Sequence, residues 1–139
     1  MPSFLHMRII GLDYGTSRIG VALGDDVTRV ATPWSVIANE SFEDVLLRIH
    51  ELVSREGAEL IVVGVPRPLA DQTRETQQAK QIRDFISRLK MDGLDVVEAN
   101  ETLTTKVAAD QVKEMGGRGK RDDLAAAAIL QNYLDALPA

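Results

Sequence analysis

The segment from residue 8 to residue 24 constrains the fold more than any other part of the sequence. Two β-rich apolar runs, residues 8–14 and 19–24, lie on either side of the short stretch Gly15-Thr16-Ser17-Arg18. Such a short gap between two such runs predicts a β-hairpin. The first run ends with Asp13 and Tyr14, so the hairpin brings a carboxylate to the end of a strand.

Strand and helix patterns alternate after this hairpin. Further strands are predicted at residues 34–37, 59–64 and 94–97. Helices are predicted between Ser41 and Gly57, which would cap the first of them, and at residues 74–90, 104–115 and 122–137. The apolar side chains of the second helix that we expect in the core are Ala79, Ile82, Phe85, Ile86 and Leu89. Strands joined by helices form right-handed crossovers, and the opening hairpin makes the sheet mixed, which predicts one α/β domain over residues 1–139 with residues 1–6 flexible.

Charge and composition narrow the possible chemistry. Sixteen basic and 21 acidic residues give a net charge of −5, which argues against an extended basic surface but allows a local basic patch. The chain has no cysteine and two histidines, so disulfides, thiolate zinc sites and a cysteine nucleophile are excluded. A bound metal ion would need oxygen ligands, which favours Mg²⁺ or Mn²⁺.

The sequence shows no targeting or membrane-spanning segment. No run approaches the roughly 20 apolar residues of a membrane span, and residues 1–7 lack the basic start and apolar core of a signal peptide. The glycosylation pattern Asn39-Glu40-Ser41 is therefore interpreted as a chance match. We expect a cytoplasmic protein without a membrane partner.

Three acidic residues, far apart in the sequence, fall where strands end or a helix begins. Asp13 ends the first strand, Glu101 follows the fifth strand, and Asp122 opens the last helix. In open α/β sheets ligands bind at the edge where such positions gather. Carboxylates brought together repel one another unless cations neutralise them, and two divalent ions about 4 Å apart would also support the attack of water on a phosphodiester.

Each of these acids also has an ordinary structural interpretation. Asp13 could be a solvated residue in a hairpin turn, and Thr104 or Thr105 could simply cap the helix after Glu101. Acids are also common in a first helical turn, as at Asp122. The four alanines at residues 125–128 favour the functional interpretation, because they allow the last helix to lie close to the sheet.

Polar and basic residues near the same predicted edge are candidate contacts to a nucleic-acid backbone. The hydroxyl of Thr16 can donate a hydrogen bond to a phosphate oxygen, and the strand that ends in Gly64-Val65-Pro66 leads into a loop with basic residues. A glycine-containing basic loop also precedes the last helix, at residues 117–121. The candidate contacts are Thr16, Arg18, Arg67, Arg118, Lys120 and Arg121.

Four motifs of this chain resemble those of the YqgF/RuvX family in order and spacing. They are Asp13-Tyr14-Gly15-Thr16 with Arg18-Ile19-Gly20-Val21-Ala22; Gly64-Val65-Pro66; Glu101 with Leu103-Thr104-Thr105; and Asp122 with Ala125-Ala126, Ile129-Leu130-Gln131 and Tyr133-Leu134. The resemblance covers residues 8–134. This family is described as candidate Holliday junction resolvases, or as candidate nucleases that process the 5′ end of pre-16S ribosomal RNA.

The resemblance implies an RNase H-like fold, with a five-stranded mixed sheet of strand order 3-2-1-4-5 flanked by helices. It also implies that Asp13, Glu101 and Asp122 form a catalytic, metal-binding triad for two-metal-ion hydrolysis with Mg²⁺ or Mn²⁺. The third acid requires a choice between neighbours. A helical wheel puts Asp123 nearer the centre of the apolar face and Asp122 on its flank, whereas the family spacing selects Asp122.

Two departures from the family pattern bear on catalysis. The family has Asp-Glu-Arg where this chain has Asn100-Glu101-Thr102. The missing acid would weaken cation binding, and the missing arginine would weaken substrate positioning. The loop after Gly64-Val65-Pro66 also lacks the family's Asp-Gly pair. These changes leave open whether the chain cleaves its substrate.

The resemblance favours processing of pre-16S ribosomal RNA by a monomer or weak dimer, and three alternatives stay open. A Holliday junction resolvase acts on DNA with two symmetric cuts and is expected to be a dimer, but this sequence shows no clear dimer surface. A noncatalytic member would bind RNA or a ribosome-maturation partner. A phosphate-binding domain of the ATPase superfamily would share the motif from Leu12 to Thr16, but those proteins use two such domains and 139 residues supply one.

Overall fold

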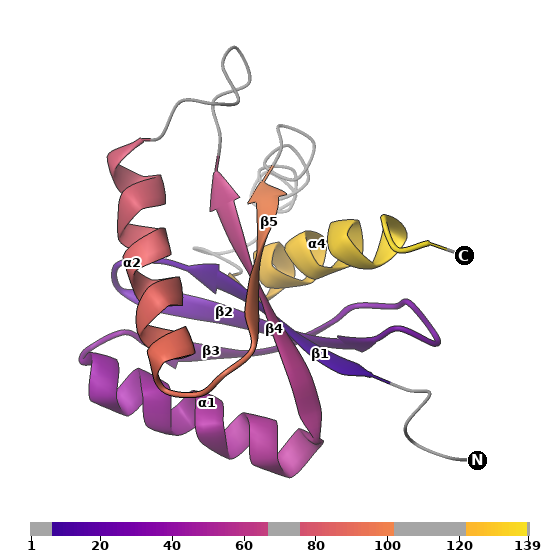
Figure 1. Ribbon diagram of the computed structural model, residues 1–139, viewed down its shortest axis with the longest axis horizontal. Helices are drawn as coiled ribbons and strands as arrows, with labels where there is room; N and C mark the ends of the chain where they lie inside the picture. The colour runs from indigo at the N-terminus through magenta and orange to yellow at the C-terminus, as the bar shows by residue number, and fades with distance from the viewer. Residues whose placement is uncertain (1–6, 67–75, 102–121, 139) are drawn as a thin grey trace, which may run out of the picture.

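The computed structural model describes residues 7–66, 76–101 and 122–138, and of Glu101 it describes the backbone only. A five-stranded sheet of order β3-β2-β1-β4-β5 lies at its centre (Figure 1). The strands are β1 (Arg8–Tyr14), β2 (Arg18–Asp25), β3 (Thr32–Ala38), β4 (Ala58–Pro66) and β5 (Val96–Glu101). The first three are antiparallel neighbours, while β4 and β5 run parallel to β1. The mixed sheet and its predicted strand order are confirmed.

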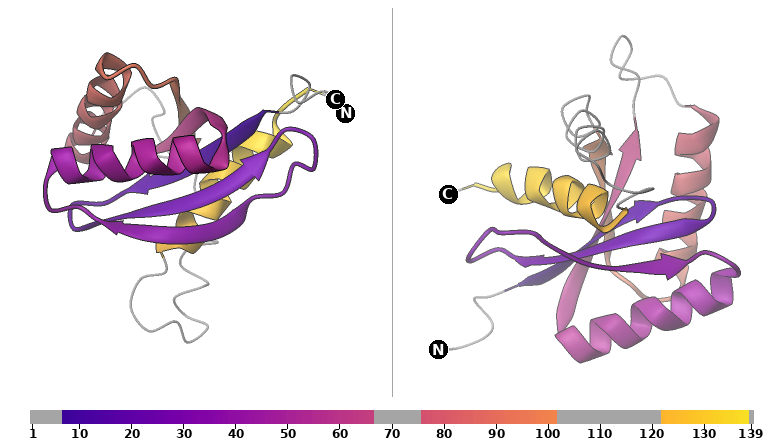
Figure 2. Two further views of the ribbon diagram at one scale, coloured as in Figure 1. Left: turned by 90° about the horizontal axis from the view of Figure 1, so that it is seen from below. Right: turned by 180° about the vertical axis from the view of Figure 1, so that it is seen from behind.

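Helices cover both faces of this sheet. The helices α1 (Phe42–Glu56) and α2 (Gln77–Met91) lie on one face, and α4 (Asp122–Asp135) lies on the other (Figure 2). The predicted caps of α1 are confirmed, because the Ser41 side chain accepts a hydrogen bond from the Asp44 N–H at 3.2 Å and Gly57 is left-handed with φ 68°. Of the helices described, none is both long and apolar enough to cross a membrane.

Several predicted boundaries differ from the structure, and two of these differences have local reasons. The helix α2 begins at Gln77 rather than residue 74, because the Thr76 hydroxyl caps it by accepting from the Ala79 N–H at 3.0 Å. The strand β5 begins at Val96 rather than residue 94, because the Leu94 N–H is still bonded to the last turn of α2, at the Leu89 carbonyl. The helix predicted at residues 104–115 lies outside the described residues.

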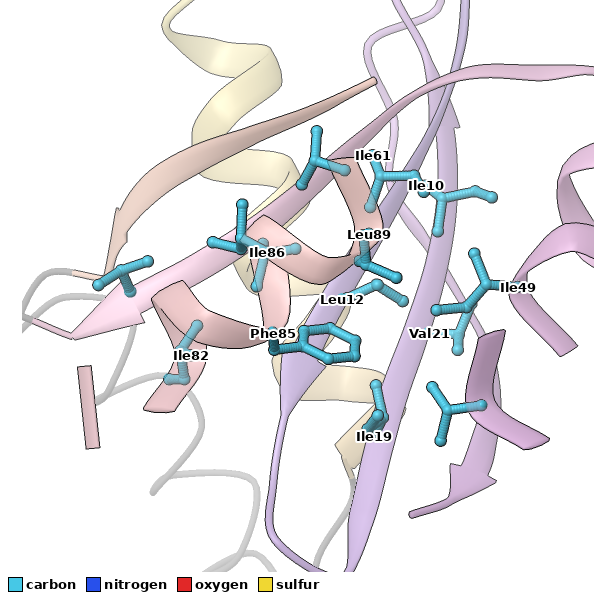
Figure 3. Packing of buried hydrophobic residues seen from close by; sticks show 14 of the residues in the cluster. Ile10, Leu12, Ile19, Val21, Ile49, Ile61, Ile82, Phe85, Ile86 and Leu89 are labelled. Carbon is cyan, nitrogen blue, oxygen red and sulfur yellow. The ribbon is translucent and has the colours of Figure 1, made fainter. Parts of the chain in front are cut away.

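Alternation along the strands separates two hydrophobic layers. Ile10 and Leu12 of β1 face α1 and α2, whereas Ile9 faces α4. Figure 3 shows the first layer, in which Phe85, Ile86 and Leu89 of α2 project onto the strands. The five core positions predicted for α2 are all buried: Ala79, Ile82, Phe85, Ile86 and Leu89.

The helix α4 lies close to the sheet because strand glycines face it. A Cβ at Gly11 would lie 2.7 Å from the Leu130 Cβ, and one at Gly64 would lie 2.6 Å from the Ile129 Cδ1. Close packing of this helix was predicted from its alanines, and Ala126 is indeed buried. The glycines of the sheet are the second half of that contact, so small residues on both surfaces bring the start of α4 to the strand ends.

Candidate active site

Three strands end at one edge of the sheet. Because β1, β4 and β5 are parallel, their carboxyl ends at Tyr14, Pro66 and Glu101 point the same way (Figure 1). The register pairs Pro66 with Glu101, so the backbone of the predicted second acid ends its strand at this edge. Asp13 lies one residue before the end of β1. This edge is the position predicted for the site.

The register of the hairpin determines which side of the sheet Asp13 faces. Asp13 is directly opposite Gly20 of β2, and directly opposed residues of an antiparallel pair face the same side. Ile9 and Gly11, four and two residues before Asp13 on β1, both face α4. Half-buried Asp13 therefore lies on the α4 side of the sheet edge.

The start of α4 rests on this same pair of residues. The main-chain carbonyl and Cβ of Asp122 press against Gly20, where no space remains for a side chain. Asp122 itself is only 9% exposed. Two acids that are far apart in the sequence are thus both neighbours of Gly20: Asp13 is its strand partner and Asp122 packs on it.

The expectation that Asp122 lies on the flank of the helix was wrong. Asp122 continues the buried row of α4, together with Ala126, Leu130 and Leu134, whereas Asp123 is only half-buried. The helical wheel failed because four residues rotate by slightly more than one turn of an α-helix. Residues four apart therefore form a row that winds gradually around the helix axis, and a helix lying across a sheet buries such a row. Asp122, which the family spacing selects over Asp123, is therefore the acid that packs against the sheet.

Arg18 neutralises the buried carboxylate of Asp122. The Arg18 Nε lies 2.9 Å from the Asp122 Oδ2. The N–H is not directed at this oxygen, so the contact is an ion pair without a hydrogen bond, and Oδ2 has no hydrogen-bond partner among the described residues. A buried oxygen without a donor is unfavourable. The ion pair and the positive end of α4 offset that penalty.

The turn between β1 and β2 is held by a residue that sequence reasoning missed as a functional candidate. The Asn39 side chain donates to the Gly15 carbonyl at 2.8 Å, and its backbone N–H donates to the Ser17 carbonyl at 2.9 Å. Asn39 therefore fixes the turn that carries Thr16 and leads to Arg18. The pattern Asn39-Glu40-Ser41 carried no sign of this role, because it depends on the pairing of β2 with β3.

A cleft of about 440 Å³ opens at the same edge, on the opposite face of the sheet from α4. Its aromatic part contains Tyr14, whose ring centroid is 4.6 Å from that of Phe85, and Phe42, whose ring is covered by the Arg88 guanidinium at 3.7 Å. The polar residues around these rings are Thr16, Asn39, Glu40, Ser41, Gln81 and Asp84. The cleft thus combines aromatic surface with amide and hydroxyl groups.

Only some of the remaining predicted site residues lie in the described part of the chain. Thr16 is exposed in the turn, and Arg18 is exposed on one side while paired with Asp122. Arg67, Arg118, Lys120, Arg121 and the side chain of Glu101 lie outside the described residues. Within the described part of the chain, no three His, Asp or Glu side chains form a group able to hold a metal ion. The triad of Asp13, Glu101 and Asp122 therefore stays a prediction.

Solved structures of low sequence identity share this fold. RuvC from T. thermophilus in complex with a Holliday junction substrate superposes with a TM-score of 0.59 at 16% identity, covering 94% of each chain. The fowlpox virus Holliday junction resolvase superposes with a TM-score of 0.54 at 14% identity, over 94% of this chain and all of that one (100%). These similarities define the class of the chain: an RNase H-like fold of the kind found in RuvC-like nucleases.

Sequence similarity narrows this class to a family. The family model described as "RuvX: Holliday junction resolvase" matches residues 7–136. A relative from Syntrophus aciditrophicus is 42% identical over 94% of this chain and 90% of its own, and one from Fusobacterium nucleatum is 37% identical over 92% and 96%; each carries the name "Putative pre-16S rRNA nuclease". The chain belongs to the RuvX (YqgF) family.

Proposed function

We propose that this chain is a divalent-metal-dependent nuclease that hydrolyses structured RNA, with the 5′-end processing of pre-16S ribosomal RNA as its task. The observation that supports this most is the packing of Asp122 on Gly20, the strand partner of Asp13. This packing supports a shared site at the edge where β5 ends in Glu101. The names of the relatives point to the same substrate, which would place the protein in the cytoplasm.

The residues at this edge suit Mg²⁺ or Mn²⁺. Asp13, Glu101 and Asp122 would offer only carboxylate oxygens, the ligands these hard cations prefer. The Asp122 Oδ2 is buried and lacks a hydrogen-bond donor among the described residues, as an oxygen intended for a cation would. When bound, divalent ions activate water and stabilise the departing oxygen of a phosphodiester.

The other residues would hold and orient the substrate. Asn39 keeps the turn rigid, so that the exposed Thr16 hydroxyl can donate to a phosphate oxygen beside Asp13. The first turn of α4 cannot move without displacing Gly20, which keeps Asp122 in place. Rigid support of this kind preserves the alignment that hydrolysis requires.

The cleft beside Tyr14 favours RNA with unpaired bases over a fully paired DNA junction. Aromatic rings with neighbouring amides and hydroxyls are the usual recognition surface for a splayed nucleobase. Glu40 and Asp84 in its described lining outnumber the one cation there, Arg88, and would repel a phosphate, so a base rather than the backbone would enter. Tyr14 directly follows Asp13, so a base in the cleft would bring its own phosphate near the acids.

Cleavage of two substrates in parallel tests this proposal. Purified protein with Mn²⁺ should cut an RNA that carries the 5′ precursor segment of 16S ribosomal RNA, and it should cut a four-way DNA junction more slowly. Asp13→Asn should abolish RNA cleavage while leaving the fold intact. The matched control is Asp95→Asn, which removes one charge from an exposed residue just before β5, at the opposite edge of the sheet.

The outcomes separate the alternatives. Equal cleavage by wild type and Asp13→Asn would reject the assigned acid. Faster cutting of the junction than of the RNA would favour the resolvase, which the solved relatives make the second candidate. RNA binding without cleavage would identify a noncatalytic member.

A further inference from the structure

The ion pair between Arg18 and Asp122 joins the start of β2 to the start of α4. The Arg18 side chain is 49% exposed, whereas the Asp122 side chain is 12% exposed, and their charged atoms are 2.9 Å apart. Arg18 is the first residue of β2, directly after the turn that carries Thr16. One partner of the pair is thus a long side chain at the solvent edge, and the other is a short side chain buried beneath it.

The two partners differ in their freedom to move. Asp122 is fixed by its backbone, which is wedged against Gly20 and continues into the buried row of α4. The Arg18 guanidinium makes no hydrogen bond to the Asp122 Oδ2, and the flexible stem of an arginine can rotate it into water. The pair can therefore separate through movement of Arg18 alone, without any change in the sheet or the helix.

We propose that Arg18 is an exchangeable counter-cation for Asp122. In the metal-free protein Arg18 neutralises the buried carboxylate; a divalent cation competes with it for the same oxygen and releases the guanidinium. The released Arg18 lies at the site edge and contacts a phosphate of the substrate. This inference rests on the proposed metal-binding role of Asp122.

The exchange couples metal binding to nucleic-acid binding. A guanidinium held by a carboxylate is a poor ligand for phosphate, while a free one binds phosphate strongly. Metal binding to Asp122 and phosphate binding to Arg18 should therefore reinforce each other, and by linkage the effect is reciprocal. The chain would present its phosphate ligand only when its metal site is loaded.

Manganese titration without nucleic acid tests the first half of this proposal. Arg18→Gln should bind Mn²⁺ about three- to tenfold more tightly than wild type, because the competing cation is gone. It should also unfold at a lower temperature without metal and gain more from saturating Mn²⁺. Arg18→Lys, which keeps the charge, should show a smaller increase in affinity and serves as the test if Arg18→Gln does not fold.

The matched control for these variants is Arg8→Gln. Arg8 is the first residue of β1, its side chain is 44% exposed, and it pairs with Glu56 at 3.4 Å near the opposite edge of the sheet. Removing it deletes the same charge and a similar ion pair, so its Mn²⁺ affinity should equal that of wild type. Equal gains in Arg8→Gln and Arg18→Gln would show a general charge effect and would overturn the exchange.

Affinity for a structured RNA tests the second half. Without divalent ions, Arg18→Gln and wild type should bind the RNA equally; with Ca²⁺, which takes oxygen ligands, the variant should bind about three- to tenfold more weakly. Equal losses with and without Ca²⁺ would identify Arg18 as a simple phosphate ligand and overturn the coupling. Asp122→Asn separates the two proposals. Unchanged Mn²⁺ binding in this variant would reject the metal-binding role of Asp122. If Asp122→Asn weakens Mn²⁺ binding but Arg18→Gln does not strengthen it, only the exchange is rejected.

Discussion

The main chain of Asp122 rests directly on Gly20, the residue paired across the hairpin with Asp13. One contact between a helix and a strand thereby connects the two acids of the proposed site that the structure describes. Because the fold and the proposed site both depend on Gly20, a side chain at this position should lower the stability of the protein.

Gly20→Ala should destabilise the protein by about 2–4 kcal/mol, because the added methyl group meets backbone atoms of Asp122 that cannot move alone. Gly64→Ala should lower the free energy of unfolding by only about 1 kcal/mol, since its methyl group meets first the flexible end of Ile129. Urea unfolding of the two variants measures the difference. Similar losses would show that the start of α4 is not wedged on β2.

The sequence predicted the strands and the order of the sheet because their signals are local or rest on family motifs. The hairpin from Arg8 to Asp25 and the caps at Ser41 and Gly57 needed only the residues themselves. The depth of Asp122 was mispredicted because it depends on how α4 crosses the sheet. The close approach of α4 depends on strand glycines such as Gly11, whose spacing with Ile9 and Asp13 on one face was a signal available in the sequence.

The site was predictable only in part for a similar reason. Asp13 and Asp122 could be selected because they stand at element ends with family spacing. The contacts of Arg18 and Asn39 depend on which residues the turn and the neighbouring strand place together. A sequence pattern does not fix such contacts, because they arise from the register of β2 with β1 and β3.

Asn39→Ala should reduce RNA cleavage more than it reduces stability. The variant loses the 2.8 Å hydrogen bond to the Gly15 carbonyl, so the turn loosens beside Asp13. We expect about a tenfold lower kcat/KM with a loss of about 1 kcal/mol in unfolding free energy. Gln78→Ala removes an exposed amide in the first turn of α2 and should leave both quantities unchanged. An Asn39→Ala enzyme with normal kcat/KM would show that the turn needs no such support.

Asp122→Asn and Asp123→Asn should separate the two neighbouring acids. Asp122 is buried at the sheet and Asp123 is only half-buried, so charge removal should matter for catalysis at position 122 alone. We expect Asp122→Asn to lower the cleavage rate by at least about 100-fold and Asp123→Asn by less than about threefold. Initial cleavage rates at saturating Mn²⁺ provide the comparison, and the reverse ranking would transfer the role to Asp123.

Anomalous diffraction from crystals of the protein soaked in Mn²⁺ tests most directly whether acids from β1, β5 and α4 together hold divalent cations. We expect anomalous density within about 2.5 Å of carboxylate oxygens of Asp13, Glu101 and Asp122, with the Arg18 guanidinium turned away from Asp122. Manganese bound elsewhere, or carboxylates of these three residues that remain empty at saturating Mn²⁺, would contradict this expectation.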